Sequence, residues 1–203
     1  MNAPTQHTIP AEIGTPFAGG FYAGKLNCDG AVYALIVSPK AAGETEMSWG
    51  EYGQDIPGAR SCFNGSANTQ AMAEAGSALA KWALELNINS HADWYLPSRD
   101  ELEMLYRAFK PTSEENFCSF RDGDNASSIP AGYLYTEQEP AQTAASAFQD
   151  GGAEAFADVW YWSSTQYSPH DAWGQDFDDG YQGHCHRHGE LRARAVRRIL
   201  LSN

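Results

Sequence analysis

The spacing of apolar positions changes along the chain and predicts strands, then helices, then strands again. Apolar runs at residues 21–24 and 30–37 flank a polar turn at 27–30, which is typical of a β-hairpin. The second run is continuously apolar, so we expect a strand that is buried on both faces. Residues 1–20 are polar and contain prolines and the Gly19-Gly20 pair. They predict an arm for attachment or oligomerisation, followed by a single domain over residues 21–203.

Two later segments have helical spacing. The apolar positions of the first, expected over residues 69–86, are Met72, Leu79, Trp82 and Leu86. Such a stripe is typical of core packing rather than of a cofactor site. The second helix begins at Ser98, where Ser98 and Glu101 form the S-x-x-E capping box, in which each side chain accepts a hydrogen bond from the other residue's backbone N–H. Its buried face consists of Leu102, Leu105, Tyr106 and Phe109, and Pro111 ends it.

The remaining segments predict loops and short strands. Residues 38–65 are rich in glycine and proline and are expected to be a loop, and the long polar stretch 111–158 is expected to be functional or mobile. A strand at 159–165 follows. Short antiparallel strands come next, around residues 172–173, Phe177 and 193–199, joined by turns at 178–180 and near Gly189. This order predicts an α+β fold with two helices packed on small antiparallel sheets and long loops.

Charge and cysteine content narrow the classes of function. The formal net charge is -13, which argues against nucleic-acid binding because phosphate contacts need clustered basic residues. The cysteines, Cys28, Cys62, Cys118 and Cys185, form no C-x-x-C pair, so we expect free thiols and no structural zinc. The chain starts with neither a basic segment nor an apolar run, and no stretch is long enough to span a membrane. We therefore expect synthesis in the cytoplasm without a signal peptide and no membrane insertion.

The densest cluster of chemically active side chains lies at residues 184–188. If this segment is a strand, His184, His186 and His188 line one face, and imidazoles in a row can bind zinc, nickel or iron. Neighbouring ligands on one strand rarely converge on a metal, so the alternative is a row of surface or ligand-contacting histidines. The catalytic and nucleotide-binding motifs G-x-S-x-G, G-x-G-x-x-G and H-E-x-x-H do not occur. We expect no cofactor and no enzymatic activity.

Four aspartates close to these histidines carry the oxygen ligands that calcium prefers. They are Asp171, Asp176, Asp178 and Asp179. They lack the spacing of an EF-hand, so we expect turn and surface roles for them.

Aromatic residues are concentrated between positions 160 and 181. Exposed Tyr and Trp beside short polar residues form rigid anchors with adaptable contacts, as in antibody paratopes. We expect exposure for Tyr161, Tyr167 and Tyr181; for Trp162, Trp173 and Phe177 core and surface positions are equally compatible with the pattern. The predicted ligand-contacting residues are Tyr161, Ser163, Tyr167, His170, Asp171, Trp173, Asp176, Asp178, Asp179, Tyr181, His184, His186 and His188.

Two groups of residues resemble a known family. Trp94-Tyr95-Leu96-Pro97-Ser98, followed by Glu101-Leu102 and Leu105-Tyr106, is similar to the W-x-L-P-S/T-x-x-E-L-x-x-L signature of the Lcl C-terminal-like domains of bacteria and phages. The second half of these domains is similar to residues 161–165, 172–173, Phe177, Gly180 and 194–197. The resemblance therefore covers about residues 20–200. It implies a C-type-lectin-like fold, related to that of formylglycine-generating enzymes and shared with the variable proteins of diversity-generating retroelements and with phage tail-tip receptor binders.

The resemblance implies a binding function. The expected partner is a host cell-surface protein or glycan, held by a homo-oligomer, often a trimer, in a phage virion or on a bacterial surface. Two alternatives stay open: a metal-dependent oxidase like the formylglycine-generating enzymes, and a structural tail or baseplate component. Those enzymes use a cysteine pair near the C-terminus, where this chain has only Cys185.

The same stretch has the composition that mutagenesis of adenines would leave. An AAC asparagine codon changed only at its adenines can encode His, Asp, Tyr, Gly, Cys, Arg or Ser. The positions that fit are His170, Asp171, Gly174, Asp176, Asp178, Asp179, Tyr181, Gly183, His184, Cys185, His186, Arg187, His188 and Gly189. Gln175 and Gln182 do not fit, so we expect them to be constant. The pattern indicates a diversified display surface.

Overall fold

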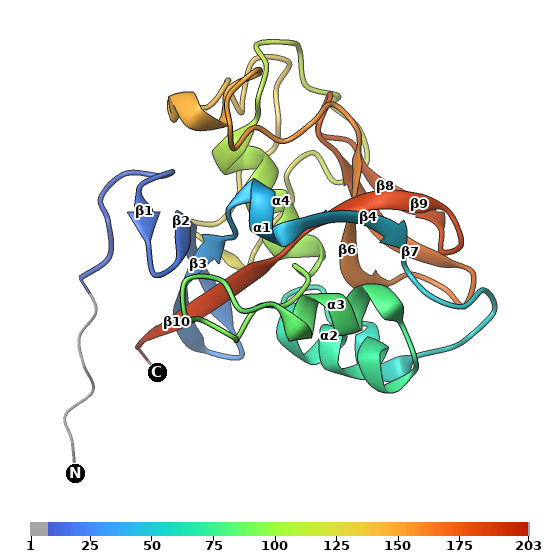
Figure 1. The fold of residues 1–203 in the computed structure, drawn as a ribbon. Coiled ribbons are helices and arrows are strands. Elements are labelled where there is room, and N and C mark those ends of the chain that lie inside the picture. The colour runs from blue at the N-terminus through green and yellow to red at the C-terminus, as the bar shows by residue number, and fades with distance from the viewer. Residues whose placement is uncertain (1–7, 203) are drawn as a thin grey trace.

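An antiparallel sheet and a mixed sheet lie on opposite sides of the computed structural model, which describes residues 8–202 (Figure 1). The first sheet has the order β1 (Pro16–Phe17), β2 (Gly20–Cys28), β3 (Ala31–Val37) and β10 (Val196–Ser202), and β5 (Ser128–Ile129) pairs with β2. The predicted β2–β3 hairpin is confirmed. Its two loop residues, Asp29 and Gly30, have φ values of 54° and 86°, the left-handed conformations that a tight two-residue hairpin loop requires. Only the second half of β3 is fully buried.

The second sheet carries the C-terminal half of the chain. Its order is β4 (Glu44–Ser48), β9 (Glu190–Arg194), β6 (Trp160–Gln166), β7 (Asp171–Asp176) and β8 (Gln182–His186). The prediction of antiparallel strands holds for the β4–β9, β6–β7 and β7–β8 pairs but not for β6 and β9, which pair in parallel at Tyr161 and Arg192. The predicted strand over 193–199 is divided between the two sheets at Ala195. The pairing of β9 with β4 ends at Arg194. Ala195 instead bonds to residues 38 and 43: Ser38 N–H donates to Ala195 O, and Ala195 N–H donates to Gly43 O.

The helices lie between the two sheets and, in the view of Figure 1, beneath them. They are α1 (Lys40–Gly43), α2 (Gly65–Glu74), α3 (Ala78–Glu85) and α4 (Arg99–Phe109). The prediction of one helix over 69–86 is wrong, because Gly76 has a φ of 102° and Ser77 caps α3 by accepting a hydrogen bond from Ala80 N–H. The capping box of α4 is confirmed: Glu101 N–H donates to Ser98 Oγ, and Ser98 N–H donates to Glu101 Oε2.

The segments predicted to be loops differ in their structure. Residues 38–65 are not only loop, because they contain α1, β4 and the short 3-10 helix η1 (Pro57–Ala59). Residues 111–158 are largely irregular, as expected, and contain only β5 and η2 (Ser146–Phe148). The N-terminal arm is attached to the domain from residue 14 onward, since Gly14 N–H donates to Tyr22 O and β1 pairs with β2. The part of the predicted arm before residue 8 lies outside the described residues.

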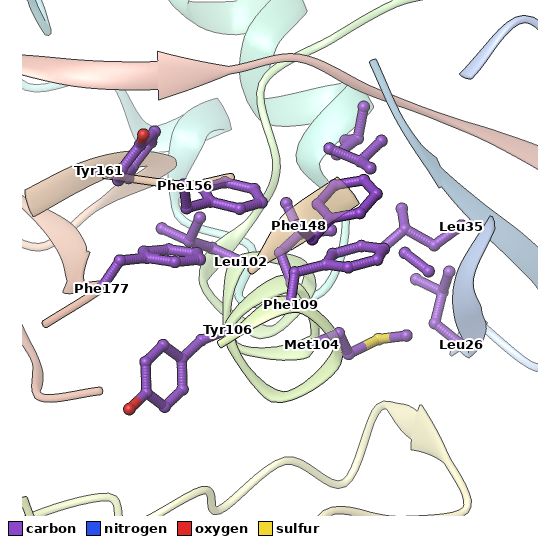
Figure 2. Close-up of a cluster of buried hydrophobic side chains, with 14 of the residues drawn as sticks. Leu26, Leu35, Leu102, Met104, Tyr106, Phe109, Phe148, Phe156, Tyr161 and Phe177 are labelled. Carbon is purple, nitrogen blue, oxygen red and sulfur yellow. The ribbon is translucent and has the colours of Figure 1, made fainter. Parts of the chain in front are cut away.

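An aromatic core holds the two sheets and the long loop together (Figure 2). Phe109 of α4 stacks on Phe148 with ring centroids 4.0 Å apart, and Phe156 stacks on Phe177 at 4.2 Å. Tyr161 of β6 packs against Phe177 at 4.9 Å. Because Phe148 and Phe156 come from residues 111–158, that loop is anchored in the core although it lacks long helices and strands.

All four cysteines are free thiols, as expected. Within residues 8–202, none of the helices combines the length and apolarity needed to cross a membrane.

Candidate ligand face

The β7–β8 hairpin positions most of the predicted contact residues. Its register places Trp173 opposite His184 and Asp171 opposite His186, so these four side chains project from the same face of the sheet. The turn between the strands is held by its aspartates: Asp178 N–H donates to Asp176 Oδ1, and Tyr181 N–H donates to Asp179 Oδ1. Asp176 and Asp179 thus act as turn acceptors.

One group of rings on this face surrounds Trp173. Tyr167 and His184 stack in parallel, with centroids 4.0 Å apart, and both meet the half-buried indole of Trp173 edge-on, at 5.3 and 6.1 Å. Tyr167 is 50% exposed. The guanidinium carbons of Arg99 and Arg121 lie 5.8 and 5.6 Å from the Trp173 ring centroid. These contacts hold Trp173 while Tyr167 and His184 stay open to solvent.

A second group surrounds Tyr52, which comes from the loop after β4. Tyr52 stacks on His170 with centroids 4.5 Å apart and meets His188 at 5.4 Å and His186 at 6.3 Å. Tyr52 is 54% exposed, and the three histidines are exposed. Nδ1 of His186 lies 2.7 Å from Asp171 Oδ1, which orients the imidazole outward. Together the two groups form what we call the ring face: Tyr52, Tyr167, His170, Trp173, His184, His186 and His188.

A buried polar layer supports the hairpin from below. Gln182 Nε2 donates to Gln175 Oε1 at 3.0 Å and to Arg99 O at 2.9 Å, and Arg121 Nε donates to Gln182 Oε1 at 2.9 Å. Both glutamines are buried. Satisfied buried amides fix the relative position of the strands that carry them.

A pair of facing glycines gives room for an indole on the other side of the hairpin. Gly174 and Gly183 are paired in register, and a Cβ atom at either one would lie 3.2 Å from the ring of Trp160. Larger residues at these two positions would have to push the indole aside.

The family can now be stated. The sequence profile of the Lcl C-terminal domain matches residues 43–197, about three quarters of the chain. The chain belongs to this family. No curated protein gives a significant match. The match extends from the end of α1 to the first two residues of β10, so it includes the whole β7–β8 hairpin and leaves out strands β1 to β3.

Two residues of this Lcl C-terminal domain that we expected to contact a ligand are buried. Tyr161 has no exposed surface: its ring is part of the aromatic core, and its hydroxyl donates to Glu44 Oε2 at 3.2 Å. Burial, with Glu44 nearby, raises the pKa of Tyr161 to about 12. Ser163 is also buried and donates to Trp173 O at 2.9 Å. Both residues are buried because β6 lies between β9 and β7 in the sheet and is covered on both faces. Side chains that alternate between the two faces of such a strand are all buried, so alternation does not identify exposed positions.

Other expectations for the aromatic residues are refined. Tyr167 is exposed as expected, and Trp162 and Phe177 are core residues. Tyr181 is half-buried rather than exposed, because its ring packs edge-on against Phe117 and Trp160, with centroids 5.2 and 5.8 Å away.

The three histidines of residues 184–188 do not form one row. Strand β8 ends at His186, and His188 lies in the following turn. His188 and His186 stack with centroids 5.8 Å apart, whereas His184 stacks on Tyr167. Across residues 8–202, no group of three or more His, Cys, Asp or Glu side chains is arranged to hold a metal ion. The prediction that all three histidines line one face of a single strand is therefore wrong for His188, whereas His184 and His186 do share a face of β8.

The ring face of the Lcl C-terminal domain includes one residue that sequence reasoning missed. Tyr52 lies between Gly50 and Gly53 in the loop after β4, and Gly53 N–H donates to Pro169 O at 2.9 Å, which brings it beside His170. An aromatic residue flanked by glycines in a loop is a usable signal for a contact residue. Phe117 and Phe120 of the long loop are also exposed, at 48% and 69%.

Proposed function

We propose that this Lcl C-terminal domain is a non-enzymatic binding protein that holds a cell-surface protein or glycan on its ring face, as part of a phage tail tip or of a bacterial surface assembly. The observation that carries the proposal is the grouping of exposed and half-exposed rings on an edge hairpin and its neighbouring loops. Three separate segments, at residues 52, 167–173 and 184–188, contribute to it. Rigid rings on a fixed scaffold lose little conformational entropy on binding.

The thiol beside the ring face does not favour catalysis, and it lies on the opposite side of β8 because Cys185 alternates with His184 and His186 along the strand. Burial, with Asp171 and Asp176 nearby, raises the pKa of the Cys185 thiol to about 11. Because a thiol must ionise to act as a nucleophile or a metal ligand, Cys185 is poorly suited to oxidase chemistry at neutral pH. Copies held together in an oligomer would add avidity to a weak single-site affinity.

The first test is binding of the labelled, purified protein to a panel of intact bacterial cells and to a glycan array. We expect the double variant Tyr52→Ala/Tyr167→Ala to bind at least about tenfold more weakly, because central aromatic anchors supply most of the free energy of such contacts. The matched control is Tyr133→Ala/Leu134→Ala, which removes two exposed side chains of residues 111–158. Equal binding by the ring-face variant and the wild type, or no binding to any surface, would refute the proposal.

We further propose that this surface is diversified by adenine mutagenesis. Among the codon-compatible positions, His170, Asp178, His184, His186 and His188 are exposed, whereas Gly174, Gly183 and Arg187 are buried. Gln175 and Gln182, which we expect to be constant, belong to the buried polar layer described above. Variation at the first set would change contacts without disturbing the scaffold.

Deep sequencing of the gene in a growing population of its host or phage tests this point. We expect adenine-derived substitutions to accumulate at the five exposed positions, with Gly174 and Gly183 retained because a Cβ atom there meets Trp160. The codons of the buried helix α4 serve as the internal control. A segment that is invariant from residue 170 to 189 would mean one fixed partner instead of a diversified surface.

A further inference from the structure

Arg187 is a buried cation without an acidic partner. It is 0% exposed, and none of the ion pairs found in residues 8–202 includes it. Its guanidinium lies 4.3 Å above the centroid of the Trp49 ring, and its Nε and Nη2 atoms are buried without a hydrogen-bond partner. Burying a charge that is neither paired nor fully hydrogen-bonded is destabilising. Such a group in a folded protein calls for a reason other than stability.

The contacts of Arg187 connect the three segments that carry the second group of rings. Nη1 donates to Gln54 O and, at 3.1 Å, to Pro169 O. The backbone of Arg187 accepts from Trp49 N–H at 3.0 Å and donates to His170 O at 3.0 Å. One residue therefore links the loop that carries Tyr52, the loop that carries His170 and the turn that carries His188.

We propose that Arg187 is a positioning residue, which touches no ligand itself but sets the arrangement of Tyr52, His170 and His188 on the ring face at the expense of stability. The part these rings play in binding rests on the proposed function, whereas their arrangement does not. The planar fork suits this role because it contacts two carbonyl groups and an indole at once, which the single ammonium of a lysine would not do.

Removal of the guanidinium would leave few polar groups unsatisfied. Gln54 O also accepts from Gln166 Nε2 at 3.1 Å, and Pro169 O also accepts from Gly53 N–H at 2.9 Å. Arg187→Met would thus remove a buried charge and two unpaired donors while both carbonyls keep a partner. A residue needed only for structure would behave in the opposite way, with a clear loss of stability.

The test combines thermal unfolding with histidine NMR on the purified full chain and needs no ligand. For Arg187→Met we expect an unfolding midpoint at or above that of the wild type. The imidazole Cε1–H signals of His170 and His188 should shift, whereas those of His184, held by Tyr167, and of His91 should not. The matched control is Arg60→Met, which removes an arginine whose side chain is 49% exposed and should shift none of the four signals.

Two outcomes would overturn the proposal. One is a folded Arg187→Met protein with unchanged His170 and His188 signals. The other is a lowered unfolding midpoint with all four histidine signals displaced alike, which would mark a merely structural residue. If Arg187→Met is insoluble, Gly50→Ala replaces it, because the added Cβ would lie 3.2 Å from Nη2 and would shift the guanidinium by a few tenths of an ångström while the arginine remains. Unchanged His170 and His188 signals in that variant would also count against the role of Arg187. If the His170 and His188 signals shift as expected but the ring-face variant binds as the wild type does, only the proposed function is contradicted.

Discussion

Phe109→Ala is expected to lower the free energy of unfolding by about 3–5 kcal/mol, the range for truncating a buried phenylalanine. Phe109 is the last residue of α4, is fully buried, and lies centrally in the aromatic core, stacked on Phe148 at 4.0 Å and on Phe156 at 6.4 Å (Figure 2). Its removal leaves a cavity and also frees the long loop, because both stacking partners belong to residues 111–158. Urea denaturation measures the change.

The matched control for this variant is Phe120→Ala, at a position that is 69% exposed. Its effect should stay within about 0.5 kcal/mol. Hydrogen exchange adds a second readout, since backbone amides near Phe148 should lose protection in Phe109→Ala before those of β3 do. A loss below about 1 kcal/mol would show that the aromatic core does not have the role that its packing indicates.

Glu101→Ala is expected to have an effect of similar size, for a different reason. The buried carboxylate of Glu101 accepts three hydrogen bonds: from Tyr95 Oη–H at 2.8 Å, Ser98 N–H at 2.8 Å and Gly65 N–H at 3.1 Å. It thereby joins the starts of α2 and α4 to the Tyr95 segment, which forms a bridge to Val196 of β10. Alanine leaves all three donors buried without acceptors, at about 1–3 kcal/mol each. Burial disfavours the charged carboxylate and raises the pKa of Glu101, so its removal offsets part of this cost, and we expect a total loss of about 3–5 kcal/mol.

Thermal unfolding measures this loss, which for a chain of this size corresponds to a midpoint lower by roughly 10 °C. Glu74→Ala provides the control, because Glu74 is exposed at the end of α2. If both variants unfold at the same temperature, the hydrogen bonds of Glu101 do not stabilise the contact between α2, α4 and the Tyr95 segment.

Elements with signals in adjacent residues could be predicted from the sequence, and elements defined by distant partners could not. The capping box of α4 and the β2–β3 hairpin depend on neighbours within a few positions and were predicted correctly. The break between α2 and α3 also had a local signal, Gly76 followed by Ser77, which the apolar stripe across it concealed. Strand β4 lies at the edge of its sheet and is short and polar, with Glu44 and Glu46 at alternate positions. It can be recognised as a strand only from its pairing with β9, which is distant in the sequence.

The candidate site shows the same limit. Tyr167 and His184 are exposed as the composition of the stretch predicted. The burial of Tyr161 follows from the order of strands in the sheet, which is a property of the whole fold. Tyr52 reaches the face through a hydrogen bond between residues 53 and 169, a contact that no local pattern encodes.

The separation of the two sheets has a practical consequence. The first two strands, β1 and β2, and the last strand, β10, all belong to the first sheet. The ring face lies on β7, β8 and the neighbouring loops at the edge of the second sheet (Figure 1). A fusion partner, dye or immobilisation tag placed before β1 or after β10 would therefore leave the ring face pointing into solution. The domain is thus suited to oriented display, and the β7–β8 residues could be randomised in the laboratory while the rest of the chain serves as an unchanged carrier.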